Sequence, residues 1–163
     1  MWCEVFKKDI ITTDKLEHGE ILCFAQGIVQ SSVYFNGTGS TRNNYSGSNL
    51  QSVINKWYDD NLKSSMDSYI VSKTLTTIHK DGTSSLNAKL FPLAGNSTSE
   101  SFYYGDYMSA GYGGSMDLDT AWWLRSGYLS GSYGVYYVTA DGNVRATDSA
   151  NPHGVRPAFV LKI

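Results

Sequence analysis

The chain has 163 residues, of which 41% are hydrophobic and 17% charged, so we expect a single globular domain over residues 1–163. Its formal net charge of -2 provides no basic patch for a phosphate backbone, and no apolar run approaches the roughly 20 residues of a bilayer span. We therefore expect neither nucleic acid as a partner nor membrane insertion, and the first residues show no signal-peptide pattern.

The chain has few residues that could form disulfides or bind a metal. The chain has 2 Cys and 3 His, without CxxC or HxxxH spacing, which argues against a disulfide framework and a metal site. A single bridge between Cys3 and Cys23 is left open. Asp117 and Asp119 alone lack the ligand count that calcium requires. We expect no metal and no cofactor.

The N-terminal half predicts short strands followed by one clear helix. Apolar and β-branched runs predict early strands at residues 21–25 and 32–35. Apolar residues then recur at i, i+3, i+4 and i+7, which predicts a helix over residues 49–60 with Ser48 as its N-cap. The apolar residues of this stripe are Leu50, Val53, Ile54 and Trp57. A weaker pattern predicts a second helix over residues 62–71.

The middle of the chain shows little periodicity. Polar and turn residues dominate residues 76–87, so no regular element is predicted there. Pro92 interrupts an apolar run at residues 88–93, which predicts an edge strand or a tethered loop. Residues 95–119 are rich in Gly, Ser and Tyr, and this composition predicts a long surface loop.

The C-terminal third has the strongest β signal. Residues 135–139 and 143–147 flank Ala140, Asp141 and Gly142, and the Asp-Gly pair predicts a hairpin closed by a type I′ turn. Alternation along its strands is then expected to divide the side chains between two faces. One face is expected to contain Tyr137 and Val144. The other is expected to contain Tyr136, Asn143 and Arg145 and to contact the ligand. Residues 156–163 predict a terminal strand that closes against an early strand.

Four segments resemble a family of uncharacterised bacterial and phage domains. They are Trp-Trp-Leu-Arg-Ser at residues 122–126, Tyr-Val-x-x-Asp-Gly-x-Val at 137–144, Gly-Val-Arg-Pro-Ala at 154–158, and the helix region with Tyr45, Ser48, Leu50 and Trp57. The resemblance extends from about residue 44 to the C-terminus. This family is similar to the formylglycine-generating-enzyme branch of C-type-lectin-like folds. It implies an α+β fold with two helices, a small twisted antiparallel sheet and long loops.

The same fold serves the variable proteins of diversity-generating retroelements, including phage receptor-binding proteins. Their hypervariable residues precede the last strand, and the corresponding stretch here is residues 127–153. The family usually has Pro after Trp-Trp-Leu-Arg-Ser, whereas this chain has Gly127, which is expected to leave the following loop less constrained. Neither formylglycine-generating chemistry nor calcium-mediated sugar binding is implied, because the cysteines and tripeptides that they need are absent.

Four large side chains inside these motifs are expected to be structural. Trp122 and Trp123 alternate along a strand, so one faces the core and the other a neighbouring layer. Arg125 and Arg156 are expected to hold loops through carbonyls and carboxylates. A ligand cradle formed by the two arginines is the alternative.

The candidate binding surface lies between residues 127 and 153. A loop with several glycines at residues 127–134 combines an adaptable backbone with flat aromatic area, as antibody paratopes do. The candidate ligand-binding residues are Tyr128, Ser130, Ser132, Tyr133, Tyr136, Asn143, Arg145, Thr147, Asp148, Asn151 and His153, with Tyr103, Tyr104 and Tyr107 as a secondary patch. The alternative is a solvated loop whose aromatic residues are structural.

These observations predict a ligand-binding module on a virion or cell surface, with a protein or cell-surface ligand. An enzyme is not expected, because the sequence shows no nucleophile elbow, no Cys–His arrangement and no evident acid–base pair. Two alternatives remain open: a structural or assembly domain of a surface or tail protein, and a degenerate enzyme of the formylglycine-generating type.

Overall fold

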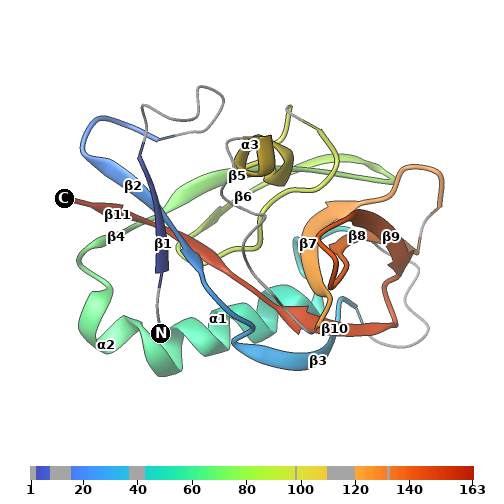
Figure 1. Cartoon of the computed structure of the whole chain (residues 1–163), viewed down its shortest axis with the longest axis horizontal. Coiled ribbons are helices and arrows are strands. Elements are labelled where there is room, and N and C mark those ends of the chain that lie inside the picture. Colours follow the sequence, from blue (N-terminus) through green and yellow to red (C-terminus); the bar gives the residue numbers. More distant parts are fainter. Residues whose placement is uncertain (1–2, 8–15, 37–42, 98, 110–119, 132) are drawn as a thin grey trace.

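The computed structural model describes residues 3–7, 16–36, 43–97, 99–109, 120–131 and 133–163. Strands dominate this part of the chain and form three sheets (Figure 1). The strands are β1 (Cys3–Lys7), β2 (Glu20–Ala25), β3 (Gln30–Tyr34), β4 (Ile70–Val71), β5 (Lys73–His79), β6 (Gly82–Ala88), β7 (Trp122–Gly127), β8 (Gly134–Val138), β9 (Val144–Asp148), β10 (Pro152–Val155) and β11 (Ala158–Lys162). The helices are α1 (Asn49–Asn61), α2 (Lys63–Met66) and α3 (Tyr104–Ser109).

The predicted fold class is wrong. We expected from the sequence an α+β, C-type-lectin-like fold with two helices, a small twisted antiparallel sheet and long loops. The described residues are instead mostly β, in sheets of four, five and two strands. Of their helices, α1 has 13 residues, whereas α2 has 4 and α3 has 6. The difference arises because segments predicted as helical or irregular, residues 62–71 and 76–87, supply β4 and most of β5 and β6.

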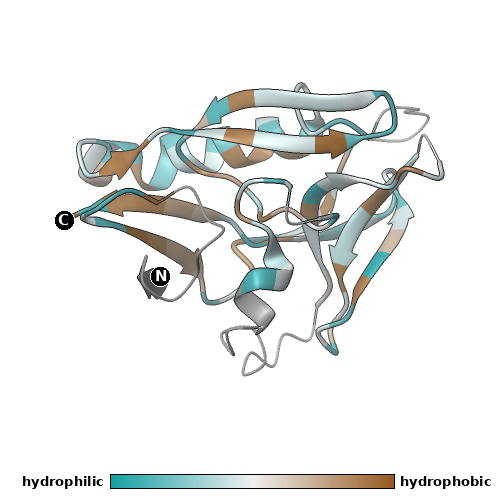
Figure 2. Cartoon of the chain, turned by 90° about the horizontal axis from the view of Figure 1, so that it is seen from above, coloured by the Kyte–Doolittle hydropathy of each residue, from teal (hydrophilic) through white to brown (hydrophobic). Residues whose placement is uncertain are grey.

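The first sheet has the order β1-β2-β11-β4. The terminal strand β11 pairs antiparallel with β2, with Val160 opposite Leu22, which confirms the prediction that it closes against an early strand. Both of these side chains are buried. Figure 2 shows β11, the strand that leads to the C-terminus, as mostly hydrophobic. The sheet is therefore held by burial of its central strands.

Helix α1 confirms the prediction from apolar spacing. The Ser48 side chain accepts a hydrogen bond from the Gln51 N–H at 3.1 Å, which is the N-cap geometry. Leu50 and Ile54 are buried against the core, and the helix runs along the lower edge of the molecule in Figure 1. Within the described ranges, none of the helices has the length and apolar character needed to traverse a lipid bilayer.

The predicted second helix is wrong over most of its length. Only Lys63–Met66 are helical, and Tyr69 is exposed. Ile70 is buried in β4, where it pairs with Leu161 of β11. Strand pairing and burial thus outweigh the weak helical preference of a serine-rich segment.

The hairpin of β5 and β6 was not predicted. Its strands pair antiparallel from Lys73 opposite Ala88 to His79 opposite Gly82. In β5 the buried positions alternate strictly, but three of them are occupied by Lys73, Thr77 and His79. A polar residue at a buried position hides the period-2 pattern that identifies a strand.

The second sheet has the order β3-β10-β7-β8-β9 and carries most of the candidate residues. Strand β7 lies at its centre, parallel to β10 and antiparallel to β8. Trp122 and Trp123 are both buried and point to opposite faces. Trp122 packs against Phe24, with ring centroids 5.6 Å apart, and Trp123 packs against Phe35 at 5.7 Å. These contacts fix the sheet against the rest of the core.

Candidate functional site

The β8–β9 hairpin is present, but its turn and register differ from the prediction. The Gly142 N–H donates to the Thr139 carbonyl at 2.9 Å, and Gly142 has a φ of 85°. Asp141 does not have a positive φ, whereas a type I′ turn requires one at both central residues. The predicted type I′ turn is therefore wrong.

The register places Tyr137 opposite Arg145, so these two side chains share a face. A two-residue turn at Asp141 and Gly142 would shift the pairing by one residue and exchange the faces of β9. The predicted division of side chains is wrong for this reason: Tyr137 shares its face with Arg145 and not with Val144.

Asn43 holds the tyrosine loop, which we define as the described residues 127–131, 133 and 134. Its Nδ2 donates to the carbonyls of Tyr128 at 3.0 Å, Gly131 at 3.2 Å and Gly134 at 2.8 Å. The Tyr128 N–H donates to the Gly134 carbonyl at 2.8 Å, which closes the loop upon itself. Asn43 is only 2% exposed, so these hydrogen bonds are shielded from water.

Gly127 makes room for this buried asparagine. A Cβ at residue 127 would lie 2.6 Å from Cγ of Asn43, closer than side chains approach. We expected the glycine to leave the loop less constrained. The structure shows the opposite, because Gly127 admits the side chain that fixes the loop.

The tyrosine loop exposes large rings although its backbone is held. Tyr128 is 39% exposed, Leu129 50% and Tyr133 47%. The Tyr128 ring meets the ring of Tyr136 edge to face, with centroids 5.7 Å apart. Tyr136 is half-buried, and burial raises the pKa of its phenol, with smaller effects from the neighbouring Tyr128, Glu100 and Tyr103.

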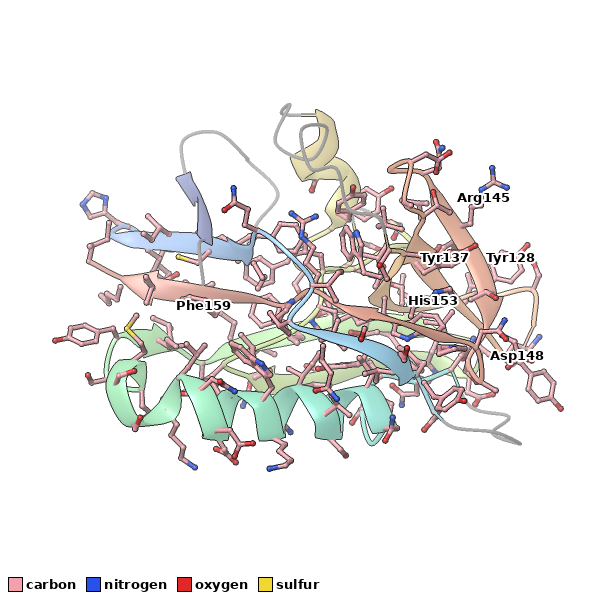
Figure 3. The ribbon with its side chains drawn as sticks, turned by 60° about the horizontal axis from the view of Figure 1, so that its bottom comes forward. Tyr128, Tyr137, Arg145, Asp148, His153 and Phe159 are labelled. Atoms are coloured by element: carbon pink, nitrogen blue, oxygen red, sulfur yellow. The ribbon has the colours of Figure 1, made fainter. Side chains whose placement is uncertain are left out.

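Residues 147–151 lie beside the end of the tyrosine loop, because Gly134 pairs with Asp148. The Ser149 N–H donates to the Tyr133 carbonyl at 2.8 Å, and Oδ1 of Asp148 accepts from the Ala150 N–H at 2.8 Å. Asn151 donates to Oγ1 of Thr147 at 2.7 Å. We name the exposed group Tyr128, Leu129, Ser130, Tyr133, Asp148 and Asn151 the tyrosine surface. Figure 3 shows Tyr128 and Asp148 at the outer end of the second sheet.

Other predicted site residues do not belong to this surface. Asn143 lies in the turn at the far end of β9, where it donates to Asp141 at 2.9 Å. Arg145 lies within β9, on the same face of the sheet as Tyr137. Tyr104 is buried against Trp122, with centroids 5.2 Å apart, and Tyr103 is partly buried. Ser132, the Tyr107 side chain, Asp117 and Asp119 lie outside the described residues.

His153 is directed inward. Its ring stacks on Tyr137, with centroids 4.4 Å apart, and meets the edge of Trp123 at 4.6 Å (Figure 3). Its Nε2 is buried and has no hydrogen-bond partner within the described part of the chain. Burial lowers the pKa of His153, which favours the neutral imidazole.

Both motif arginines are buried and hold the backbone in place. Arg125 donates to Oγ1 of Thr77 at 2.9 Å and to the Pro92 carbonyl at 2.8 Å. Arg156 donates to the Ala25 carbonyl at 2.7 Å and covers the ring of Phe24 at 3.8 Å. Such burial leaves neither guanidinium exposed to a ligand.

Two residues that organise this region, Asn43 and Glu100, were not predicted from the sequence. The buried Glu100 carboxylate accepts hydrogen bonds from the Ile78 N–H at 2.8 Å and from the Ser126 hydroxyl at 2.7 Å. It thereby joins β5 to β7. Both residues occur in polar segments without periodicity, so no pattern in the sequence identifies them. Among the described residues, no three His, Cys, Asp or Glu side chains are grouped to hold a metal.

Comparison with known proteins gives a family and no close relative of established function. No curated protein and no solved structure matches the chain. Residues 10–163 match the family described as "Domain of unknown function (DUF6273)". Because this match covers nearly the whole sequence, the chain belongs to the DUF6273 family.

Proposed function

We propose that the chain is a binding module that recognises a protein ligand through the tyrosine surface. The observation that carries the proposal is the buried Asn43 beneath the loop, combined with the exposed rings of Tyr128 and Tyr133 above it. Ordering a loop upon binding costs free energy, and a loop that is already held avoids much of that cost. Tyrosine adds large contact area with only two side-chain torsions to fix.

The surroundings of the rings support the same function. Exposed aromatic residues bordered by polar groups form the usual pattern of a binding hot spot. Here Ser130, Asp148 and Asn151 supply the hydrogen-bonding groups.

The experiment is selection of binders from a random peptide library displayed on phage. Peptides selected on the wild-type protein are tested against the Tyr128→Ala, Tyr133→Ala double variant. We expect their affinity to fall by about thirtyfold or more, because losing one hot-spot side chain costs about 2 kcal/mol. Tyr69→Ala is the matched control, since Tyr69 is 57% exposed and lies between α2 and β4.

Folding of the variants is checked by thermal unfolding, which exposed substitutions change little. Peptides that bind the double variant as tightly as the wild type, or that lose affinity for Tyr69→Ala, would refute the assignment. Wild-type protein that self-associates through this surface, while the double variant stays monomeric, would indicate an assembly domain instead.

A further inference from the structure

A polar cleft lies at the other end of the molecule from the tyrosine surface. It has a volume of about 510 Å³, a size typical of small-molecule sites. The start of β2, the end of β11 and the junction of β4 with β5 form it. Figure 1 shows β4 and the C-terminus at the left and β8 and β9 at the right, and Figure 2 places the C-terminus at the same end.

Four charged side chains line the cleft: Glu17, Glu20, Lys73 and Lys162. Nζ of Lys73 lies 2.5 Å from Oε2 of Glu20, and these side chains are only 9% and 2% exposed. The same Oε2 accepts the Glu17 N–H at 2.8 Å. Lys162 is directly opposite Glu20 in the pairing of β11 with β2, so its side chain lies on the same face of the sheet.

The buried pair has hydrogen-bonding capacity beyond its own contact. An ammonium carries three N–H donors and a carboxylate has two acceptor oxygens. Within the described part of the chain, the Lys73 ammonium forms an ion pair with Glu20, and the contacts of the Glu20 carboxylate with Lys73 and with the Glu17 N–H both involve Oε2. A buried ion pair is stabilised when further hydrogen bonds satisfy its remaining donors and acceptors. A polar ligand in the cleft can supply them.

The charges of the lining define the class of ligand. Two carboxylates and two ammonium groups cancel, so a net anion or a net cation would meet a like charge as well as an opposite one. A zwitterion pairs each of its charges with the opposite sign. Ser72, which is exposed and also lines the cleft, has a hydroxyl that can bind one of the remaining polar atoms of the ligand.

We propose that this cleft binds a small zwitterion of the amino-acid or short-peptide class. Its ammonium lies at Glu17 and Glu20, and its carboxylate lies at Lys73 and Lys162. A sugar-like polyol fits less well, because sugars usually pack on an aromatic face and none of the described lining residues is aromatic. The proposal is independent of the tyrosine surface and would survive its failure.

The test is an NMR titration of the full chain that follows backbone amide shifts. The probe is alanyl-alanine, compared with its N-acetyl form, its C-terminal amide and glucose. Alanyl-alanine is expected to shift the amides of residues 72–74. The N-acetyl form and the C-terminal amide should each bind more weakly than alanyl-alanine, by about tenfold or more, because each lacks one charged group and its hydrogen bond to the cleft.

Lys162→Gln tests the assignment of the carboxylate, since Lys162 is exposed at the rim and its replacement leaves the buried pair intact. This substitution should weaken the binding of alanyl-alanine by about tenfold and leave the binding of its C-terminal amide unaffected. Lys56→Gln is the control, because Nζ of Lys56 pairs with Oδ2 of Asp60 at 2.8 Å on the exposed face of α1, outside the residues that line the cleft. Absence of shifts with alanyl-alanine, equal binding of the capped forms, or shifts with glucose alone would overturn the proposal.

Discussion

Replacement of Asn43 by alanine tests how firmly the tyrosine loop is held. The substitution removes both Nδ2 donors, which reach three loop carbonyls at 2.8–3.2 Å, and the Oδ1 acceptor of the Lys80 N–H at 3.0 Å. Each side-chain donor or acceptor that is lost costs about 1 kcal/mol, so the two N–H donors and the one oxygen acceptor of Asn43 together cost about 3 kcal/mol. For a domain of this size, that loss lowers the melting temperature by about 6–12 °C.

The assay combines thermal unfolding with amide hydrogen exchange. In Asn43→Ala, the amide of Tyr128 should exchange faster than in the wild type, because the loop that holds it opens more often. Asn61→Ala is the matched control. Its side chain is exposed and donates one hydrogen bond, to the Trp57 carbonyl at 2.9 Å, so the change should stay within about 0.5 kcal/mol.

An isosteric substitution separates the donors from the acceptor. Asn43→Asp keeps an oxygen for the Lys80 N–H but directs a carboxylate oxygen at three carbonyls, so it should destabilise the loop at least as much as alanine does. If Asn43→Ala melts like the wild type and exchange at Tyr128 is unchanged, Asn43 does not hold the loop and the reasoning is refuted.

Three further predictions concern buried groups. Because burial lowers the pKa of His153, its neutral form stabilises the fold, and this contribution is lost as pH falls below the unfolded value of about 6.5. The free energy of unfolding of the wild type should therefore fall relative to His153→Phe from about pH 7 to about pH 5, and parallel curves would contradict this. Gly127→Ala places a Cβ 2.6 Å from Cγ of Asn43 and should cost about 1–3 kcal/mol in denaturant unfolding; a neutral result would mean that the contact relaxes freely. Lys73→Met leaves the buried Glu20 without its cation and should cost about 3–5 kcal/mol. Adding Glu20→Gln should recover part of this loss, and a double variant less stable than Lys73→Met would argue against the buried pair.

Elements with local signals were predictable from the sequence. The spacing of Leu50 and Ile54 and the Ser48 cap specify α1 without reference to the rest of the chain. The apolar run after Pro157 likewise indicates β11, whose pairing with β2 accords with the burial of both strands. In these cases the local preference and the tertiary environment agree.

Elements that depend on distant partners were not predictable. The buried face of β5 contains Lys73 and Thr77, which are tolerated there because Glu20 and Arg125 reach them from other parts of the chain. A pattern of polar residues gives no indication of such partners. The prediction of the fold class was wrong largely for this reason, because most of the β5–β6 hairpin was predicted to be irregular.

The candidate surface was predicted in composition but not in geometry. Its tyrosines were identified from residue type. The two faces of β9 were predicted the wrong way round, because the turn is one residue longer than a two-residue turn and shifts the register by one residue. His153 was expected at the surface, and its stacking on Tyr137 follows only from the parallel contact of β10 with β7. The role of Asn43 depends on contacts 85–91 residues away.

The central claim is that a held loop presents Tyr128 and Tyr133 to a protein ligand. Hydrogen exchange of the wild-type protein, with and without a peptide selected from the displayed library, tests it most directly. The account predicts slower exchange for amides of residues 128–134 and 148–151 in the complex. Protection confined to other segments, with exchange in these two unchanged, would contradict it.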